Sequence, residues 1–358
     1  MSMLTPKAGG DVSKKTFPIV YSEDYLGYHL GDEHPLNRDR IKKTMEYFSS
    51  IGLLDVLEVI EPKRAREEDV LLVHDEELLE RVKSERGSLS PDTPLFKGVF
   101  NSSLRAVGGT ILCAELALKG KVCFNPLGGF HHAGVRTSSG FCYFNDIAIA
   151  CEKLISEENV SRIAILDVDA HHANGTQEIF YSRKDVLLVS IHQDGRTLYP
   201  GTGFTWEIGS GDGRGFNYNF PMPPGSGDEA YSIAMNLAIE IIEKYSPELL
   251  IYQGGVDTHY SDILTDLIVT NRGIWEMAHR TRELANRLEI GVAVLFGGGY
   301  GLETLPTRFS SLVSGFIGLN CPKDLEIRSD DEVLRRVKGV VEEVRGLFED
   351  SPISKGNI

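Results

Sequence analysis

Short runs of apolar residues alternate with longer amphipathic stretches along most of the chain. The runs are nearly continuous in apolar character, which is typical of β-strands covered on both faces. They lie at 121–124, 162–169, 185–192, 248–255 and 291–299. The stretches carry apolar residues at spacings of three and four, which predicts helices. They lie at 103–118, 144–155, 228–244 and 273–288, and we expect Asp228 to be the N-cap of the third.

This alternation predicts an α/β fold in which a central parallel sheet has helices on both faces. We expect a single domain over residues 16–350, between a flexible N-terminus at 1–15 and a C-terminal tail at 351–358. The segment 209–227 is rich in glycine, proline and asparagine. It is predicted to be a long loop on the functional face.

Composition narrows the class of protein. Lys and Arg total 37 against 52 Asp and Glu, so the 358-residue chain has a formal net charge of −15. Such a chain repels phosphate backbones, which argues against direct nucleic-acid binding and favours cationic ligands such as polyamines or lysine-rich segments. No apolar run reaches the roughly 18 residues of a membrane span. The five cysteines form no CxxC pair, which favours a reducing, cytoplasmic environment.

Titratable side chains follow four of the predicted strands. His131 and His132 come after the first run, and a segment rich in Asp and His (167–174) continues the second. Asp257 and Tyr300 follow the fourth and fifth runs. Because open parallel sheets bind ligands outside the carboxyl ends of their strands, we expect these side chains to form one site.

Asp167, Asp169 and His171 are spaced by two, so in an extended backbone their side chains share one side. With Asp257 from another strand end, Asp169 and His171 make a set of two oxygen ligands and one nitrogen ligand. Three protein ligands with an open position are typical of catalytic zinc, although Fe(II), Co(II) and Mn(II) fit the same donors. The alternative is that Asp169 and His171 only cap strand ends or form hydrogen bonds in the core.

The two adjacent histidines suit general acid–base work, because the ordinary pKa of histidine is near neutrality. Tyr300 follows three glycines that allow close backbone approach, and its phenol could donate a hydrogen bond to an oxyanion. Alone, each feature also fits a structural histidine pair or an ordinary loop aromatic.

The chain resembles the zinc-dependent histone deacetylase superfamily, which includes acetoin-utilisation proteins and acetylpolyamine amidohydrolases. The motifs occur in the family's order and extend from about Tyr21 to Gly301. They are HPLNRDRI (34–41), GGFHHAGVRTSSGFCYFNDIAIA (128–150), LDVDAHHANGTQEIFY (166–181), SIHQDGRTLYPGTG (190–203), GGVD (254–257) and GGGY (297–300). The resemblance implies the arginase-deacetylase α/β fold. It also implies that residues 16–350 form a deacetylase catalytic domain.

The resemblance further implies two metal sites. One zinc ion per chain would be bound by Asp169, His171 and Asp257. A structural monovalent cation, K⁺, would be bound by side chains of Asp167 and Ser190 and by backbone oxygens near Asp169, His171 and Ile191.

The resemblance also assigns catalytic roles. His131 and His132 correspond to the tandem catalytic histidines, and Tyr300 to the tyrosine that polarises the amide carbonyl. Asp167 corresponds to the carboxylate that orients His131. Asn174 stands where some members place an aspartate beside the second histidine. A neutral amide stabilises the imidazolium of His132 less, so it stays open which histidine is the base and which the acid.

A tunnel for the acyl-lysine chain is implied as well. Phe141 and Tyr199 correspond to its aromatic walls, beside Gly140. Asp92 corresponds to an acid at the rim that grips the substrate backbone, or else it is a surface turn residue. Leu264 stands near the position where one polyamine-selective branch carries a glutamate gate.

We therefore predict a metal-dependent hydrolase that removes an acetyl group from N-acetyl-lysine, with acetylated polyamines as the alternative substrate. A ureohydrolase with two manganese ions is disfavoured because Thr258 and His259, rather than carboxylates, follow Asp257. A non-catalytic binding protein of the same fold is a third alternative. The resemblance of segment 34–41 implies that Arg40 lines an exit channel for acetate, and the alternative is that it lies on a solvated helix face.

Overall fold

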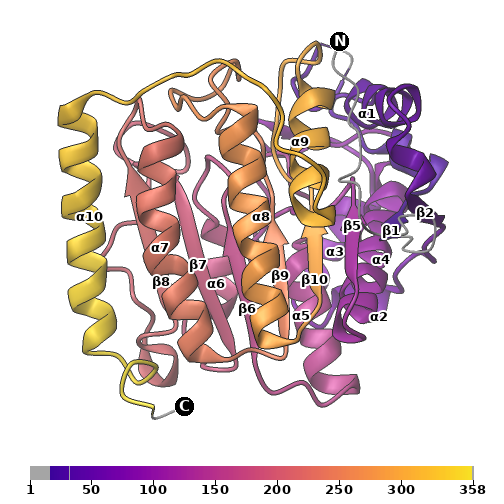
Figure 1. Ribbon diagram of the computed structural model, residues 1–358. Helices are drawn as coiled ribbons and strands as arrows, with labels where there is room; N and C mark the ends of the chain where they lie inside the picture. The colour runs from indigo at the N-terminus through magenta and orange to yellow at the C-terminus, as the bar shows by residue number, and fades with distance from the viewer. Residues whose placement is uncertain (1–16, 32, 357–358) are drawn as a thin grey trace.

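The computed structural model describes residues 17–31 and 33–356, and the flexible N-terminus predicted for 1–15 lies outside them. One sheet contains eight strands, and every neighbouring pair is parallel (Figure 1). From edge to edge they are β2 (Leu57–Ile60), β1 (Phe17–Val20), β5 (Val122–Asn125), β10 (Val292–Leu295), β9 (Leu249–Gln253), β6 (Ile163–Asp167), β7 (Val186–Gln193) and β8 (Asn217–Met222). A separate antiparallel pair consists of β3 (Ser88–Ser90) and β4 (Thr93–Pro94). The predicted α/β fold with a central parallel sheet is confirmed.

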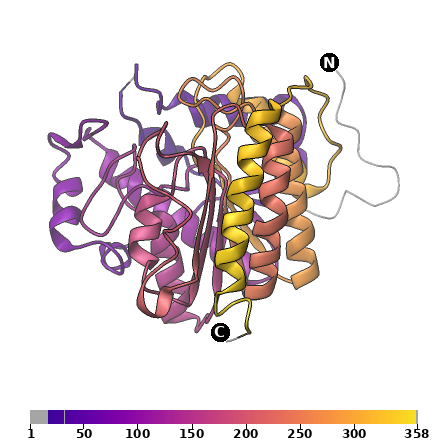
Figure 2. The same ribbon diagram turned by 90° about the vertical axis from the view of Figure 1, so that its left-hand side faces the viewer.

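Helices cover both faces of the sheet, which is seen edge-on in Figure 2. One layer consists of α1 (Asp39–Ser50), α7 (Asp228–Tyr245), α8 (Asn271–Leu288), α9 (Leu305–Ile317) and α10 (Asp331–Glu349). The other layer consists of α2 (Glu67–Val70), α3 (Glu76–Lys83), α4 (Val99–Leu118), α5 (Asp146–Glu157) and α6 (Asn174–Phe180). Short 3-10 helices lie at Glu23–Gly27, Leu53–Asp55 and Gly211–Gly213. Within the described ranges, no helix is both long enough and apolar enough to span a bilayer.

The central strands explain the apolar runs in the sequence. All residues of β6 and β9 are buried, because helices cover both faces. Successive side chains alternate between two hydrophobic cores: Ala164 and Leu166 of β6 belong to the core that includes α7 and α8, and Ile163 and Ile165 to the core that includes α4 and α5. The same alternation occurs in β9 and β10. The sheet therefore separates two hydrophobic cores and contributes side chains to both.

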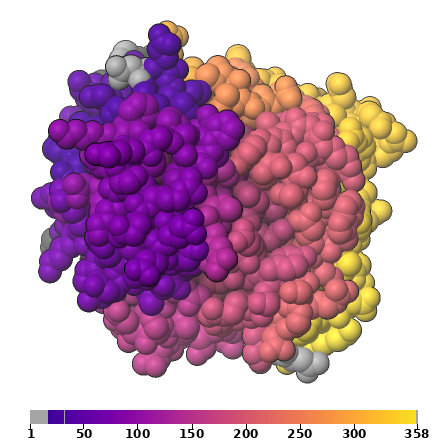
Figure 3. All heavy atoms as spheres, turned by 180° about the vertical axis from the view of Figure 1, so that it is seen from behind, coloured from indigo at the N-terminus to yellow at the C-terminus, as the bar shows by residue number. Residues whose placement is uncertain are grey.

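The order of the strands positions the functional site. The four strands that precede the titratable side chains are β5, β10, β9 and β6, and they are consecutive neighbours in the sheet. Their carboxyl ends therefore lie at one edge, side by side. The space-filling view from behind shows the indigo and purple N-terminal segments lying beside the salmon-coloured middle of the chain (Figure 3).

The prediction of a long loop over 209–227 is wrong, because this segment contains β8. Tyr218, Phe220 and Met222 alternate into the core that includes α7 and α10, and glycine and proline on either side hide this pattern. Pro221 is tolerated because β8 pairs with β7 alone, so it is an edge strand of the sheet.

The prediction that Asp228 caps α7 is also wrong, because Gly227 is the N-cap and Asp228 is the first helical residue. Its carboxylate accepts hydrogen bonds from the backbone N–H (2.8 Å) and the hydroxyl (2.7 Å) of Thr270. Asp228 therefore connects the starts of α7 and α8, since Thr270 is the N-cap of α8.

Candidate metal centre and active site

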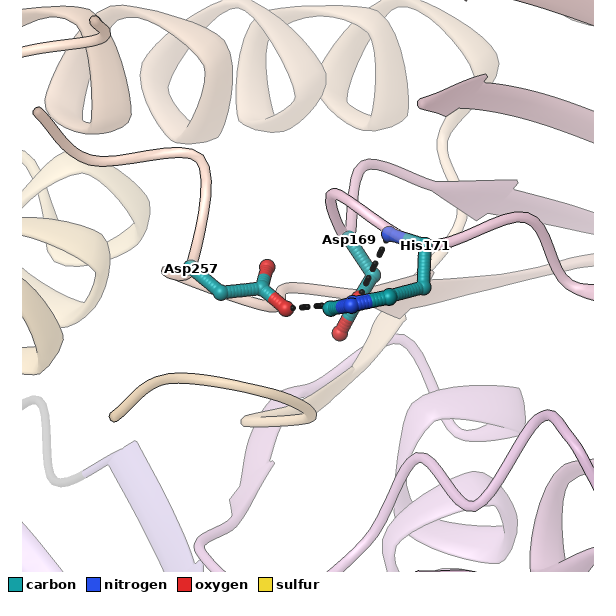
Figure 4. Close-up of side chains that lie close together, drawn as sticks. All are labelled: Asp169, His171 and Asp257. Carbon is teal, nitrogen blue, oxygen red and sulfur yellow. Dashed lines mark hydrogen bonds and ion pairs between the residues drawn. The ribbon is translucent and has the colours of Figure 1, made fainter. Parts of the chain in front are cut away.

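Three side chains that could bind a metal ion converge after two neighbouring strands. Asp169 and His171 lie in the loop that follows β6, and Asp257 lies in the loop that follows β9. Their ligand atoms all lie within 4.8 Å of one another. Nδ1 of His171 lies 2.9 Å from Oδ2 of Asp257 and 3.2 Å from Oδ1 of Asp169 (Figure 4). The structure thus brings together the three predicted metal ligands.

The surrounding chain fixes both carboxylates. Oδ2 of Asp169 accepts hydrogen bonds from the backbone N–H of Gly298 (2.8 Å) and the side chain of Gln253 (3.0 Å). Oδ1 of Asp257 accepts one from the N–H of Ala170 (2.8 Å). A Cβ at Gly298 would lie 2.5 Å from Oδ2 of Asp257, so glycine is required for this close approach.

The charge of the cluster favours a bound cation. Asp169 and Asp257 are buried, so water does not screen their charges. Burial, together with the neighbouring charge of Asp169, raises the pKa of Asp257 to about 7. A divalent ion would balance these charges, and two carboxylates with one imidazole are suitable donors for zinc, iron, cobalt or manganese.

The two adjacent histidines follow β5 and lie beside this cluster. Nδ1 of His131 lies 2.8 Å from Oδ2 of Asp167, and Nδ1 of His132 lies 2.6 Å from Oδ1 of Asn174. Since a carboxylate and an amide oxygen only accept, both Nδ1 atoms carry protons. The two Nε2 atoms are 3.1 Å apart. A hydrogen bond between them therefore requires one extra proton, shared by the pair.

The two rings have different electrostatic surroundings. Burial alone would lower the pKa of His131, but the charges of Asp167 and Asp169 raise it above its usual value. Burial and the neighbouring rings of His131 and His171 lower the pKa of His132 well below its usual value. The extra proton therefore favours His131.

Tyr300 reaches the same site from the glycine loop after β10. Its ring lies edge-on to Phe141, with the centroids 5.7 Å apart. Arg40 is buried and donates to the carbonyls of Gly299 and Gly297 at 2.8 Å each. The solvated position considered for Arg40 is therefore excluded, because its guanidinium holds this loop.

A narrow cavity of about 30 Å³ lies among these groups. Its lining includes Leu36, Phe130, His131, His132, Gly140, Phe141, Asp169, His171 and Tyr300. Three predicted tunnel residues, Tyr199, Leu264 and Asp92, are not among the described residues that line it.

These three residues lie farther out. The ring of Tyr199 is 5.1 Å from that of His132, and its hydroxyl donates to Oγ of Ser139 (2.7 Å). Asp92 accepts the N–H of Gly140 (3.1 Å), so it contacts the loop that carries Phe141. Leu264 is half-buried.

The residues predicted to bind a monovalent cation are on the neighbouring strand pair. Asp167 of β6 and Ser190 of β7 are register partners, and Ile191 is next along β7. Both side chains are buried, and Oγ of Ser190 lies 2.8 Å from Nδ1 of His192. Binding of K⁺ here stays a prediction.

Two polar residues that hold the site, Gln253 and Asp146, were not predicted from the sequence. Gln253 ends β9, and besides Asp169 it contacts the carbonyl of Gly129 (3.2 Å). Asp146, the first residue of α5, accepts the N–H groups of Gly129 and Phe130, just before His131. A glutamine within an otherwise apolar strand was a signal that could have been followed. Asp146 has no such local signal.

Comparison with known proteins identifies the family of the chain. Residues 34–316 match the model of the histone deacetylase domain. The chain therefore belongs to the histone deacetylase family, and the resemblance inferred from the motifs is confirmed. Membership implies a metal cofactor and acetylated substrates.

Relatives of known sequence cover most of the chain. A probable deacetylase of Archaeoglobus fulgidus is 37% identical over 349 residues, which are 91% of this chain and 96% of the relative. The acetoin utilization protein AcuC of Staphylococcus aureus is 35% identical over 302 residues, covering 80% of this chain and 77% of that protein. Among solved structures, the HD domain of HDA15 aligns with a TM-score of 0.82 and 26% identity, over 95% of this chain and 99% of that one.

Proposed function

We propose that this deacetylase is zinc-dependent and removes the acetyl group from N-acetyl-lysine side chains of proteins. The observation that supports the proposal most directly is one cavity lined by Asp169 and His171 of the carboxylate–imidazole cluster, by the two adjacent histidines and by Tyr300. Each of these groups has a distinct part in amide hydrolysis.

Asp169, His171 and Asp257 would hold the ion. When bound, a divalent ion supplies Lewis acidity, which polarises the acyl carbonyl and lowers the pKa of water. The chain's contribution is to fix the two carboxylates through Gly298, Gln253 and Ala170.

The histidine pair would move the protons. The neutral ring accepts a proton from the attacking water, and the protonated ring gives one to the leaving amine, which could not depart as an anion. Asp167 holds His131 with Nε2 facing the partner ring, and Asn174 does the same for His132. The shared proton between the two Nε2 atoms suits this exchange of roles.

Tyr300 would donate its phenolic proton in a hydrogen bond to the tetrahedral oxyanion. Phe141 and Tyr199 would flank the alkyl chain of the substrate. Roughly four methylenes of a lysine chain, at about 0.8 kcal/mol each, would contribute about 3 kcal/mol to binding. The site would therefore favour long-chain amines over short ones. A monovalent cation such as K⁺ would stabilise the loop after β6 through Asp167 and Ser190.

An acyl-substrate panel with zinc-reconstituted protein tests the proposal. We expect kcat/KM for an acetyl-lysine peptide to exceed that for N-acetylspermidine by at least about tenfold, with one metal ion per chain. The reverse preference would make acetylated polyamines the substrate. Two metal ions with hydrolysis of a guanidine substrate would indicate a ureohydrolase, and a metal-loaded protein inert toward every acyl amine would indicate a binding protein.

A further inference from the structure

A fully enclosed ion pair lies behind the tyrosine of the site. Nη1 of Arg308, in the first turn of α9, lies 2.7 Å from Oδ2 of Asp262, and both side chains have 0% exposure. Of the lysine and arginine ion pairs in the described residues, this is the only one in which both side chains are completely buried.

Such a pair is poorly explained by stability alone. Removing two charges from water costs several kcal/mol per ion, and well-packed apolar residues often stabilise a core equally well. What distinguishes this pair is its set of hydrogen bonds. Nη2 of Arg308 donates to the hydroxyls of Ser261 (2.9 Å) and Thr304 (2.7 Å), so one guanidinium joins the loop after β9 to the start of α9.

The carboxylate of Asp262 makes the contact that matters for chemistry. Its Oδ2 accepts the backbone N–H of Tyr300 at 2.7 Å, and its Oδ1 accepts the N–H of Leu264 at 3.1 Å. One carboxylate thus fixes the backbone of the tyrosine and that of a predicted tunnel residue. Asp262 also belongs to the loop that carries Asp257.

The segment that carries Tyr300 has little stiffness of its own. It reads Gly297-Gly298-Gly299-Tyr300-Gly301, and glycine has the greatest backbone freedom of all residues. Arg40 holds the carbonyls of Gly297 and Gly299. Asp262 provides the hydrogen bond at Tyr300 itself.

We propose that Asp262 and Arg308 are positioning residues that hold the hydroxyl of Tyr300 where the oxyanion forms. This inference rests on the function proposed above. Because Arg308 presents a planar fork, it can hold Asp262, Ser261 and Thr304 together, which a lysine at this position cannot do.

Turnover by the zinc-loaded full-length protein tests the proposal first. Asp262→Asn is expected to lower kcat at least about tenfold with little change in KM, because small misplacements of a catalytic group cost up to about 10² in rate. Zinc affinity, measured by competition with a chelator, is expected to stay unchanged. In the Tyr300→Phe background the same substitution should cost less than about twofold. Equal losses in both backgrounds, or a loss of zinc affinity, would overturn the proposal.

Two further variants separate positioning from general destabilisation. Asp69→Asn removes a largely buried carboxylate that pairs with Lys153 and Arg66, away from the site, and should keep wild-type kcat. Arg308→Lys keeps the charge but not the fork, so its kcat should fall between those of Asp262→Asn and wild type. If Asp262→Asn does not fold, Arg308→Lys in both tyrosine backgrounds decides by the same criterion.

Amide hydrogen exchange gives a readout that needs no activity. The peptide containing Tyr300 should exchange slowly in wild type and in Asp69→Asn, and faster in Asp262→Asn or Arg308→Lys. Unchanged protection of this peptide in both site variants would refute the positioning role. A wild-type protein that is inactive toward every acyl amine would end the proposed function instead, and exchange alone would then decide whether Asp262 fixes this loop.

Discussion

Single atoms decide the chemistry of this site, and Tyr300 offers the clearest case. Its ring packs against Phe141 at the cavity, so removing the hydroxyl leaves the packing intact. Loss of one oxyanion donor typically costs about 10² to 10³ in rate. We expect Tyr300→Phe to lower kcat by that factor and to unfold at the wild-type temperature. Steady-state kinetics and thermal denaturation check this, and near wild-type turnover would contradict the role assigned to the hydroxyl.

Gly298 gives a second prediction at this scale. A methyl group there would meet Oδ2 of Asp257 at 2.5 Å and Oδ2 of Asp169 at 2.7 Å, so both carboxylates must shift. We expect Gly298→Ala to weaken zinc binding at least about tenfold, measured by competition with a chelator. Gly339→Ala is the matched control, because no atom beyond the adjacent backbone of its own helix lies within 4 Å of the added methyl. Unchanged zinc affinity in Gly298→Ala would show that the carboxylates adapt.

At the scale of the element, buried side chains connect loops to helices. His74 is buried between the loop that carries Gly134 and the start of α5. Its Nδ1 lies 2.9 Å from the carbonyl of Gly134, and its Nε2 accepts the N–H of Asn145, the N-cap of α5. Burial lowers the pKa of His74 from 6.5 to about 4. The ring is therefore neutral in the folded state at neutral pH.

This shift predicts loss of stability in acid. The unfolded chain binds a proton at His74 near pH 6.5, but the folded chain does so only near pH 4. The contribution of the neutral His74 ring to the free energy of unfolding is therefore complete above about pH 6.5 and lost by about pH 4. This contribution is roughly 3 kcal/mol, at 1.36 kcal/mol per pKa unit. Urea unfolding at several pH values should show that His74→Gln flattens the pH dependence in this window. If the free energy of unfolding of His74→Gln depends on pH as steeply as that of wild type, the pKa shift assigned to His74 is wrong.

Helix α10 gives the complementary case of an exposed element. Gly339 lies in its interior and faces solvent, where glycine costs about 0.5–1 kcal/mol relative to alanine. Gly339→Ala should raise the free energy of unfolding by about that amount, measured by urea denaturation, with no change in turnover.

Most of the strands, but not all, could be predicted from the pattern of apolar residues in the sequence. The five central apolar runs became β5, β6, β7, β9 and β10, because strands covered on both faces need continuous apolar residues. Strands β1 and β2 were not predicted: β2 is an edge strand with two exposed residues, so its pattern is weak. Strand β8 lies within the segment 209–227, which was predicted to be a loop. The alternation of Tyr218 and Phe220 with polar residues is the pattern that indicates this strand. Burial alone does not make a strand recognisable, because β8 is buried throughout and was missed: its asparagine and proline residues interrupt the apolar run.

The candidate site was likewise predicted only in part. Asp169, His171 and Asp257 come together as expected, because they follow neighbouring strands. Asp262, Gln253 and the Asp167–His131 contact depend on distances between segments far apart in the chain, which periodicity does not contain. The motif resemblance indicated one of these contacts, since it assigned Asp167 to orient His131. It indicated no role for Asp262 or for Arg308.

On the scale of the whole molecule, a bound ion should contribute to stability. Two buried carboxylates lose their balancing charge when the metal is removed. At zinc concentrations about 100-fold above the dissociation constant, binding contributes about 2.7 kcal/mol. Thermal denaturation should show a higher midpoint with zinc than with a chelator, and Asp257→Asn should abolish most of the difference. An equal midpoint in both conditions would argue against a metal site here.

The strand order also has a consequence for biosynthesis. β9 and β10 are late in the sequence, yet they insert between β5 and β6, which leave the ribosome much earlier. A nascent chain that ends before residue 292 therefore has the two halves of its sheet unjoined, even though it already contains every proposed zinc ligand. Activity should thus appear only after β10 has emerged, because His131 and His132 follow β5, on the other side of the gap, and Tyr300 follows β10 itself.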